Sequence, residues 1–380
     1  MSTLKRKPAR SEIRCSICNR PQEIAGQLFC QHDDSPLVAV PSSFDTERKK
    51  HTNFSRRFAD VLPLSRVASC RESESLNAEC RELSSVAKRY GIGRLFVQNE
   101  CGLPTGTTKA RMAAGTLAHL YETGVRDFVV VSTGNSTSAM TRLLKSYPEM
   151  HMHAFCGIDF VQRHRLRDTK NIRFHAVTGD FVEAGRQAKE FARKKRLVWE
   201  GGFFNPVRRI SLATAYLEAC DEIGDSPHWY IQAVSSAMGL VGVGEMADAQ
   251  RAAGVISRFP RLVGVQQETC APMVRAFDEG CLQIEPRHVV KNPSGIATAI
   301  LRGDPTSSYP MVRQHVLNSK GTLESVSQAD ILNAQRYLRR KRGIPVGGAA
   351  AAAFAAVIKM GKAKKFRRDE VVLVNLTGRF

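Results

Sequence analysis

The sequence lacks the long apolar runs that would place it in a membrane. The uncharged stretch from Ile344 to Ile358 is rich in Ala and Gly and is shorter than the about 20 apolar residues that span a bilayer. Near the start, Lys5, Arg6 and Lys7 are not followed by an apolar segment, so we expect no secretory signal. These absences exclude an integral membrane protein and predict a cytoplasmic protein without a membrane partner.

Aromatic residues are also scarce, at 7% of the chain. The formal charge is +20, and its local basic clusters contain few aromatic side chains. Such a field attracts polyanions, acidic proteins or anionic substrates. Without interleaved aromatics, solvated helix faces explain the clusters better than a nucleic-acid site does. An acidic protein partner stays open. The clusters are 5–10, 193–196, 339–342 and 362–368.

At 380 residues with 43% hydrophobic content, the chain is long enough for two or three globular domains. Its ten cysteines are thiols or metal ligands in a reducing compartment. Cys15 and Cys18 have the spacing of a zinc knuckle, and Cys30 with His32 could complete a four-ligand site. The sequence thus favours a structural zinc site, or its degenerate remnant, within an extension over residues 1–40.

From residue 94 onward, apolar strand-like runs alternate with amphipathic segments. This alternation is typical of a parallel sheet covered by helices, and it predicts an α/β fold. The segment 62–67 reads as a short strand or extended piece. We expect strands at 94–98, 127–132, 151–156, 172–177, 229–234, 261–266 and 370–376. We expect helices at 109–119, 134–147, 160–168, 181–195, 210–223, 238–253, 272–279, 327–342 and 349–360.

One turn carries a candidate nucleophile. The segment from Gly102 to Thr108 follows a strand-like run, and its glycines and proline impose a turn. Lys109 then opens a predicted helix. A lysine amine in this position can bond covalently to an aldehyde cofactor, and nearby backbone N–H groups can hold an anion. Taken by itself, the stretch is better explained by an ordinary solvated lysine in the first turn of a helix.

Two further turns also join a strand to a helix. The first runs from Ser132 to Thr137, and its hydroxyl and amide groups can donate to a carboxylate. The second runs from Val234 to Leu240, and its small residues allow backbone N–H groups to approach a phosphate. Ligands of parallel sheets bind where strands end in this way. Each turn also fits a plain strand–helix connection with an N-cap.

From about Leu62 to Thr377, the order of these motifs resembles the threonine synthase family of fold-type II pyridoxal-phosphate (PLP) enzymes. Pro104-Thr-Gly-Thr-Thr-Lys109 is similar to the family's segment with the cofactor-bearing lysine. Asn205-Pro-Val-Arg208 resembles the family's Asn-Pro-Tyr-Arg. The segments 261–266, 271–277, 295–300 and 376–378 match the family pattern closely, and the cysteine-bearing extension resembles a ribbon found on some members.

The resemblance implies a two-lobed α/β fold with a zinc-ribbon-like extension and a set of site residues. It places the large domain at 41–110 with 201–380, and the small domain at 111–200. Lys109 would be the catalytic residue. The cofactor would be bound by Lys109, Asn135, Ser235, Ser236, Ala237, Met238, Gly239 and Thr377, with Thr377 at the pyridine nitrogen. The substrate would be bound by Thr108, Ser132, Thr133, Gly134, Asn135, Ser136 and Arg208.

Departures from the family pattern shape the expected activity. Met238 stands where the phosphate loop has a glycine, and Phe203-Phe204 and Ile210-Ser211-Leu212 replace polar anchors for a substrate phosphate. We therefore expect a homodimeric PLP-dependent lyase or transferase in specialised amino-acid biosynthesis. It would act on an amino acid with a leaving group on Cβ or Cγ, by elimination or replacement. Threonine synthase proper is the alternative enzyme. A degenerate, non-catalytic protein recruited to an acidic partner is the alternative of another class.

Overall fold

The computed structural model describes residues 11–22, 26–45, 47–71, 75–131, 134–158, 161, 167–179 and 181–380. The chain forms two compact units. Unit 1 comprises Met1–Leu76 and Lys109–Ser211, and unit 2 comprises Asn77–Thr108 and Leu212–Phe380. Residues 41–76 thus lie with the segment that begins at Lys109, whereas the sequence analysis assigns them to the large domain. The predicted division into an extension and two domains stays a prediction.

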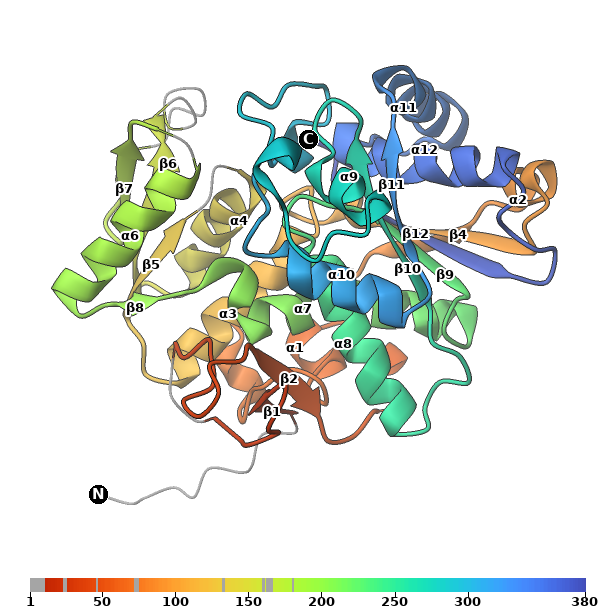
Figure 1. Ribbon diagram of the computed structural model, residues 1–380. Helices are drawn as coiled ribbons and strands as arrows, with labels where there is room; N and C mark the ends of the chain where they lie inside the picture. Colours follow the sequence, from red (N-terminus) through yellow and green to blue (C-terminus); the bar gives the residue numbers. More distant parts are fainter. Residues whose placement is uncertain are drawn as a thin grey trace. The chain divides into compact units, whose positions relative to one another are not determined.

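Unit 1 contains a parallel four-stranded sheet in the order β7-β6-β5-β8 (Figure 1). Its strands carry continuous apolar runs such as Phe128-Val-Val-Val131, because helices cover both faces of a parallel sheet. The small side chains Ala184, Ala188 and Ala192 seat α6 on one face. The elements are β5 (Asp127–Val131), β6 (His151–Gly157), β7 (Ile172–Val177), β8 (Val198–Trp199), α3 (Lys109–Glu122), α4 (Asn135–Leu143) and α6 (Phe181–Lys195).

A small ribbon, also in unit 1, pairs β1 (Ser11–Cys15) with β2 (Leu37–Pro41) in antiparallel register. It packs against the segment that follows β8. The rings of Phe29 and Phe204 lie 4.9 Å apart, and Arg209 donates a hydrogen bond to the carbonyl of Leu37. A Cβ at Gly201 would lie 2.2 Å from Leu28 Cδ2, so this approach requires glycine. The short helix α1 (Phe54–Arg57) completes the early part of the unit.

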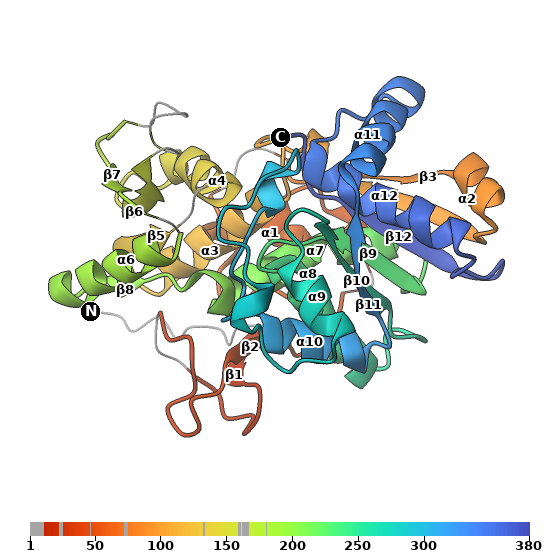
Figure 2. The ribbon, with the colours of Figure 1, turned by 45° about the horizontal axis from the view of Figure 1, so that its top comes forward.

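Unit 2 is built on a six-stranded sheet in the order β11-β10-β9-β12-β4-β3, in which only β3 is antiparallel to its neighbour. The alanine-rich helix α12 packs on one face within a large apolar core. Helices α8 and α10 contact β10 and each other (Figure 2). The strands are β3 (Glu79–Glu82), β4 (Arg94–Asn99), β9 (Trp229–Ala233), β10 (Arg261–Gln267), β11 (Thr322–Val326) and β12 (Val371–Leu376).

The helices of unit 2 are α2 (Ser84–Tyr90), α8 (Met238–Ala252), α9 (Pro272–Asp278), α10 (Tyr309–Asn318), α11 (Gln328–Arg342) and α12 (Gly348–Lys362); α7 (Pro206–Ile223) begins in unit 1 and ends in unit 2. The predicted α/β class is confirmed, and most predicted elements recur. The expected strand or extended piece at 62–67 is wrong, because this segment forms bends that lead into a 3₁₀ turn at Val67–Ser69. The helix expected at 160–168 falls largely outside the described residues.

Among the described residues, no helix combines the length and apolarity needed to cross a membrane. The alanines of α12 are buried on nearly all sides of the helix. The apolar, alanine-rich sequence of this helix is thus explained by its place in the core.

Candidate active site

Three neighbouring strands of unit 2 end at one edge of its sheet. Strand β12 pairs in parallel with β4 on one side and with β9 on the other. The segment after β4 leads to Thr108, the residue after β12 is Thr377, and the loop after β9 is Ser235–Ala237. The sheet therefore gathers three of the predicted motifs at its carboxyl edge, which is where parallel sheets bind ligands.

The turn before Lys109 is held by backbone pairing to the end of the chain. The N–H of Thr108 donates to the carbonyl of Thr377 at 2.9 Å, and the N–H of Arg379 donates to the carbonyl of Gly106 at 3.0 Å. Gly106 adopts φ +73°, and a Cβ there would meet Arg379 and Phe380. The hydroxyl of Thr108 is buried and has no hydrogen-bond partner among the described residues, so it presents a free polar group beside Lys109.

The loop after β9 ends in a helix N-terminus without a side-chain cap. Ala237 is the N-cap residue of α8, at φ +63°, and makes no capping hydrogen bond. The first N–H groups of a helix have no intrahelical acceptor and form a site for anions. Ser235 and Ser236 stay partly exposed, whereas Ala237, Met238 and Gly239 are buried. This arrangement suits a phosphate group despite the replacement of a glycine by Met238.

A cluster of buried polar side chains supports the start of α8. The Tyr230 hydroxyl donates to Gln232 Oε1 at 2.7 Å, and Asn375 Nδ2 donates to the same oxygen at 3.2 Å. A Cβ on Gly239 would lie 2.8 Å from Gln232 Nε2. Gly239 is therefore required where α8 begins over the Gln232 side chain. The sequence analysis missed Gln232 and Asn375, because polar residues within apolar strands carry no periodic signal.

In unit 1, Lys109 is the first residue of α3 and keeps partial exposure to solvent. Desolvation, and next the positive charge of Arg208, lower the pKa of the Lys109 amine to about 8. Both effects act in the same direction, because burial and a like charge each disfavour the protonated amine. A substantial fraction of Lys109 is thus neutral near physiological pH, as a nucleophilic or basic lysine requires.

Arg208 is held by a buried carboxylate. Its Nε donates to Glu200 Oε1 at 2.5 Å, and the two side chains are 3% and 1% exposed. Asn205 Nδ2 donates to the same oxygen at 2.9 Å, and Asn205 Oδ1 accepts the N–H of Val207, which caps α7. The sequence analysis missed Glu200, whose position before two glycines gives no catalytic signal.

One further contact links Arg208 to the helix α4. Arg208 Nη2 approaches Met140 Sδ on α4 at 3.8 Å, which ties the arginine to the helix that starts at Asn135. Gly134 is the N-cap of α4, and Asn135 and Ser136 form its partly exposed first turn. Ser132 and Thr133, predicted to bind substrate, lie outside the described residues.

The side chains present fit pyridoxal phosphate. The aldehyde needs a neutral amine, which the lowered pKa of Lys109 provides. The phosphate needs N–H and hydroxyl donors, which the uncapped start of α8 and Ser235–Ser236 provide. The buried hydroxyl of Thr108, which has no hydrogen-bond partner among the described residues, is a further polar group that a ligand could meet.

Cys15, Cys18 and Cys30 come together in the ribbon, as predicted for metal ligands. The fourth member of their group is Asp33, whose ligand atom lies with the three sulfurs within 4.8 Å of one another. His32 is not a member of this group. Only its backbone N–H takes part, donating to Cys30 Sγ at 3.4 Å.

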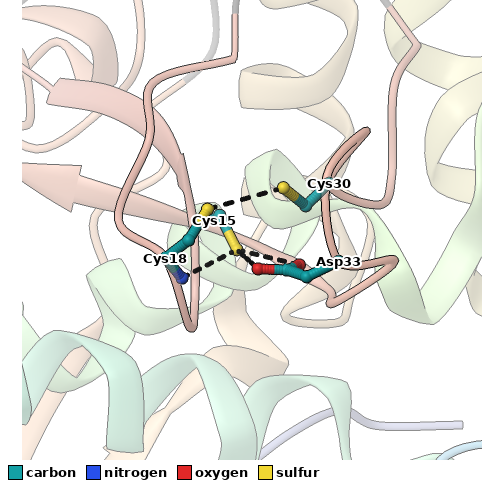
Figure 3. A group of neighbouring side chains, drawn as sticks. All are labelled: Cys15, Cys18, Cys30 and Asp33. Carbon is teal, nitrogen blue, oxygen red and sulfur yellow. Dashed lines mark hydrogen bonds between the residues drawn. The ribbon is translucent and has the colours of Figure 1, made fainter.

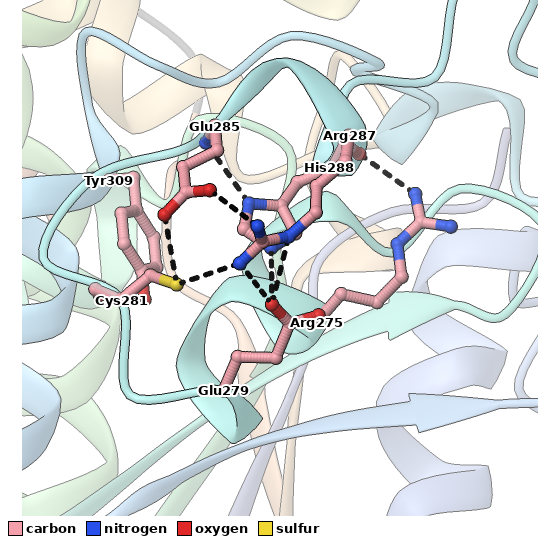
Figure 4. Close-up of polar contacts among 7 residues, drawn as sticks. All are labelled: Arg275, Glu279, Cys281, Glu285, Arg287, His288 and Tyr309. Carbon is pink, nitrogen blue, oxygen red and sulfur yellow. Dashed lines mark hydrogen bonds and ion pairs between the residues drawn. The ribbon is translucent and has the colours of Figure 1, made fainter.

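A second group, Glu279, Cys281 and His288, also lies within metal-ligand range. Figure 4 shows the guanidinium of Arg287 among these residues, 2.8 Å from both Glu279 and Glu285. The N–H of Glu285 donates to His288 Nδ1, so the ring proton lies on Nε2, which donates to Glu279 at 3.1 Å. With Nε2 protonated and a cation already present, the group is an ion-pair cluster that shapes this loop.

Comparison with known proteins agrees with the fold. The family described as "Pyridoxal-phosphate dependent enzyme" matches residues 74–378. The chain is 28% identical to the threonine synthase of Methanocaldococcus jannaschii over 330 residues, which cover 85% of this chain and 79% of that protein. It is also 28% identical to the cysteate synthase of Methanocorpusculum labreanum over 378 residues, which cover 96% and 92%.

A solved structure supports the fold independently. The processed form of threonine deaminase isoform 2 from Solanum lycopersicum matches with a TM-score of 0.65 at 14% identity, covering 89% of this chain and 86% of that chain. At such low identity the match speaks for the fold alone.

The chain thus belongs to the family of pyridoxal-phosphate dependent enzymes. Within it, the protein is a lyase or transferase of the threonine synthase-like group that acts on amino acids, as the sequence predicted.

Proposed function

We propose that this enzyme catalyses replacement or elimination at Cβ or Cγ of an amino acid, with Lys109 both holding the cofactor and moving the Cα proton. The observation that carries the proposal is the Lys109 amine itself, whose pKa is lowered to about 8 by desolvation and by Arg208. An ordinary lysine amine is protonated at neutral pH and can neither attack an aldehyde nor accept a proton. A pKa near 8 makes both steps accessible.

The remaining cofactor contacts are divided among named groups. Bound pyridoxal phosphate supplies an electron sink for the negative charge that develops on Cα. The start of α8, with Ser235 and Ser236, would hold the phosphate. Asn135 would hold the ring's oxygen. The Thr377 hydroxyl would meet the ring nitrogen with a neutral hydrogen bond, and it cannot protonate that nitrogen as a carboxylic acid would. Loss of a leaving group is thereby favoured over transamination.

The lack of free polar groups in the segment 200–208 argues for a substrate other than O-phosphohomoserine. Arg208 is the cation that could meet a substrate phosphate, but its Nε is engaged by Glu200 within a buried pair. Phe203 and Phe204 stand where polar anchors are expected and pack edge to face. Losing charged hydrogen bonds to a phosphate at about 1.5–3 kcal/mol each weakens such binding severely.

The similarity to cysteate synthases over nearly the whole chain supports replacement at Cβ. Cysteate carries a sulfonate on Cβ, so an enzyme named for it forms a bond between Cβ and sulfur. We favour for this chain a substrate with a leaving group on Cβ and a small anionic nucleophile. The chain's charge of +20 attracts such anions toward the protein.

A substrate screen tests the proposal. The purified protein, loaded with pyridoxal phosphate, is mixed separately with O-phosphoserine, O-acetylserine, serine, threonine and O-phosphohomoserine, with and without sulfite. We expect release of the leaving group from a Cβ-substituted serine, and a new amino acid when sulfite is present. Lys109→Ala is the control and should release nothing. Formation of threonine and phosphate from O-phosphohomoserine would instead identify threonine synthase proper.

The binding-protein alternative has its own signature. A degenerate site would give a colourless protein that takes up no pyridoxal phosphate, whatever the substrate. The homodimer, the acidic protein partner and the cytoplasmic location stay predictions, and size-exclusion chromatography with light scattering tests the first of them.

A further inference from the structure

Four side chains of the ribbon converge from two turns. Cys15 ends β1 and Cys18 follows it by three residues, while Cys30 and Asp33 lie in the turn that leads to β2. Figure 3 shows the three sulfurs and the carboxylate turned toward one another. Cys18 Sγ lies 3.7 Å from Cys30 Sγ, and Cys15 Sγ lies 3.4 Å from both carboxylate oxygens of Asp33.

The Cys18–Cys30 and Cys15–Asp33 separations fit two edges of a tetrahedral metal site. With Zn–S bonds of about 2.3 Å and Zn–O bonds of about 2.0–2.2 Å, the edges of a zinc tetrahedron are about 3.8 Å between sulfurs and about 3.5 Å between sulfur and oxygen. The observed 3.7 Å and 3.4 Å agree with both edges. A disulfide is excluded for Cys18 and Cys30, because its sulfurs would lie about 2.05 Å apart.

Backbone N–H groups already stabilise negative charge on the ligand atoms of this cluster. The N–H groups of Ile17 and Cys18 both donate to Cys15 Sγ at 3.3 Å, and the N–H of His32 donates to Cys30 Sγ at 3.4 Å. Metal-bound cysteines are thiolates, and such N–H donors stabilise their charge. The N–H of Ser35 donates to Asp33 Oδ1 at 3.0 Å and orients the carboxylate, as partners of metal ligands commonly do.

The ribbon also has too little apolar interior to be stable alone. Its core consists of Cys15, Cys30 and Leu37, with Ile13 packed against them. A two-stranded sheet of this size is marginal in water, and small modules of this kind are commonly completed by a metal. Two of its three core residues are the proposed ligands themselves.

We propose that Cys15, Cys18, Cys30 and Asp33 bind one Zn²⁺, with the Asp33 carboxylate as the fourth ligand in the place that the sequence assigns to His32. All four positions are then filled by protein, as in structural zinc sites, so the ion has no open position for catalysis. The site does not depend on the proposed reaction, because none of its residues belongs to the candidate active site.

Metal content in matched variants tests this assignment. The full-length protein is purified under reducing conditions, and its zinc is measured by mass spectrometry and by competition with a chromogenic chelator. We expect one zinc per chain in the wild type and in the matched control His32→Ala. In Asp33→Ala the zinc affinity should fall on the order of 100-fold or more, because even outer partners of metal ligands contribute 10–100-fold.

Cobalt substitution keeps the test decisive if Asp33→Ala does not fold. Cobalt in the wild-type site should give tetrahedral d–d bands and thiolate-to-cobalt charge-transfer bands. In Asp33→Cys the charge-transfer bands should intensify, because four thiolates replace three. A wild-type protein that binds neither metal overturns the proposal. So does a loss of zinc in His32→Ala with retention in Asp33→Ala, or a cobalt spectrum that Asp33→Cys leaves unchanged.

Discussion

Arg208 Nε and Glu200 Oε1 lie 2.5 Å apart, with both side chains almost fully buried. This pair lies beside Lys109, whose pKa the charge of Arg208 helps to lower. A buried arginine would be costly without a partner, and Glu200 offsets that cost while leaving enough positive charge to act on the lysine. The pair therefore stabilises the fold and also helps to lower the pKa of the proposed catalytic amine.

Replacing Glu200 by Gln should destabilise the protein by about 3–5 kcal/mol, because it leaves the guanidinium of Arg208 buried without a counter-charge. The free energy of unfolding in urea measures this loss. The matched control is Glu190→Gln on α6, whose carboxylate pairs with Lys194 and Arg186 at the surface, so this substitution should leave the free energy of unfolding nearly unchanged. Equal losses in the two variants would contradict the assignment of Glu200.

Replacing Arg208 by Gln should raise the pKa of Lys109, because a like charge that disfavours the protonated amine is removed. The measurement is the rate at which the cofactor-free protein takes up pyridoxal phosphate as a function of pH. In the wild type this rate should rise with pH through about 8, since only the neutral amine reacts. In Arg208→Gln the midpoint of this pH dependence should lie at a higher pH than in the wild type.

Arg193→Gln, on the exposed end of α6, should leave the wild-type midpoint in place. A midpoint near the ordinary lysine value in the wild type itself would contradict the desolvated state of Lys109.

Gly239→Ala should weaken cofactor binding, because the added Cβ would press on Gln232 Nε2 at 2.8 Å. Gln232 cannot yield freely, since Tyr230 and Asn375 hold its carbonyl oxygen. The start of α8 should therefore shift, and with it the proposed phosphate site. Titration with pyridoxal phosphate, followed by absorbance, measures the change. We expect a loss on the order of 10-fold, about 1.4 kcal/mol.

Gly185→Ala is the matched control for this substitution. Gly185 lies within α6 and a Cβ there meets nothing within 4 Å, so cofactor affinity should stay the same. Helix propensity predicts a gain in stability of up to about 1 kcal/mol. A Gly239→Ala protein that binds the cofactor as tightly as this control would contradict the proposed position of the phosphate.

The sequence predicted the α/β class and the strand–helix order because these depend on apolar periodicity, which is local. It also singled out Lys109 and the turns after β4 and β9, because glycine, proline and small residues mark such turns. It could not find Glu200, Gln232 or Asn375. Their importance comes from what they touch across the sheet or the helix start, and spacing along the chain does not encode those contacts.

The metal ligands illustrate the same limit at short range. The spacing Cys-x-x-Cys indicated Cys15 and Cys18, and the sequence assigned the other two ligands to Cys30 and His32, whereas Asp33 follows His32 in the same turn. Residues one apart in a turn can point in opposite directions, and only the path of the turn decides between them. The structure groups Asp33 with the three sulfurs.

The proposed chemistry requires covalent attachment of pyridoxal phosphate to Lys109. The protein is incubated with the cofactor, reduced with borohydride, digested and analysed by mass spectrometry. We expect a single modified peptide, carrying a pyridoxyl group on Lys109, and no such label in Lys109→Ala. A label on another lysine, or an unlabelled protein after reduction, would contradict that expectation.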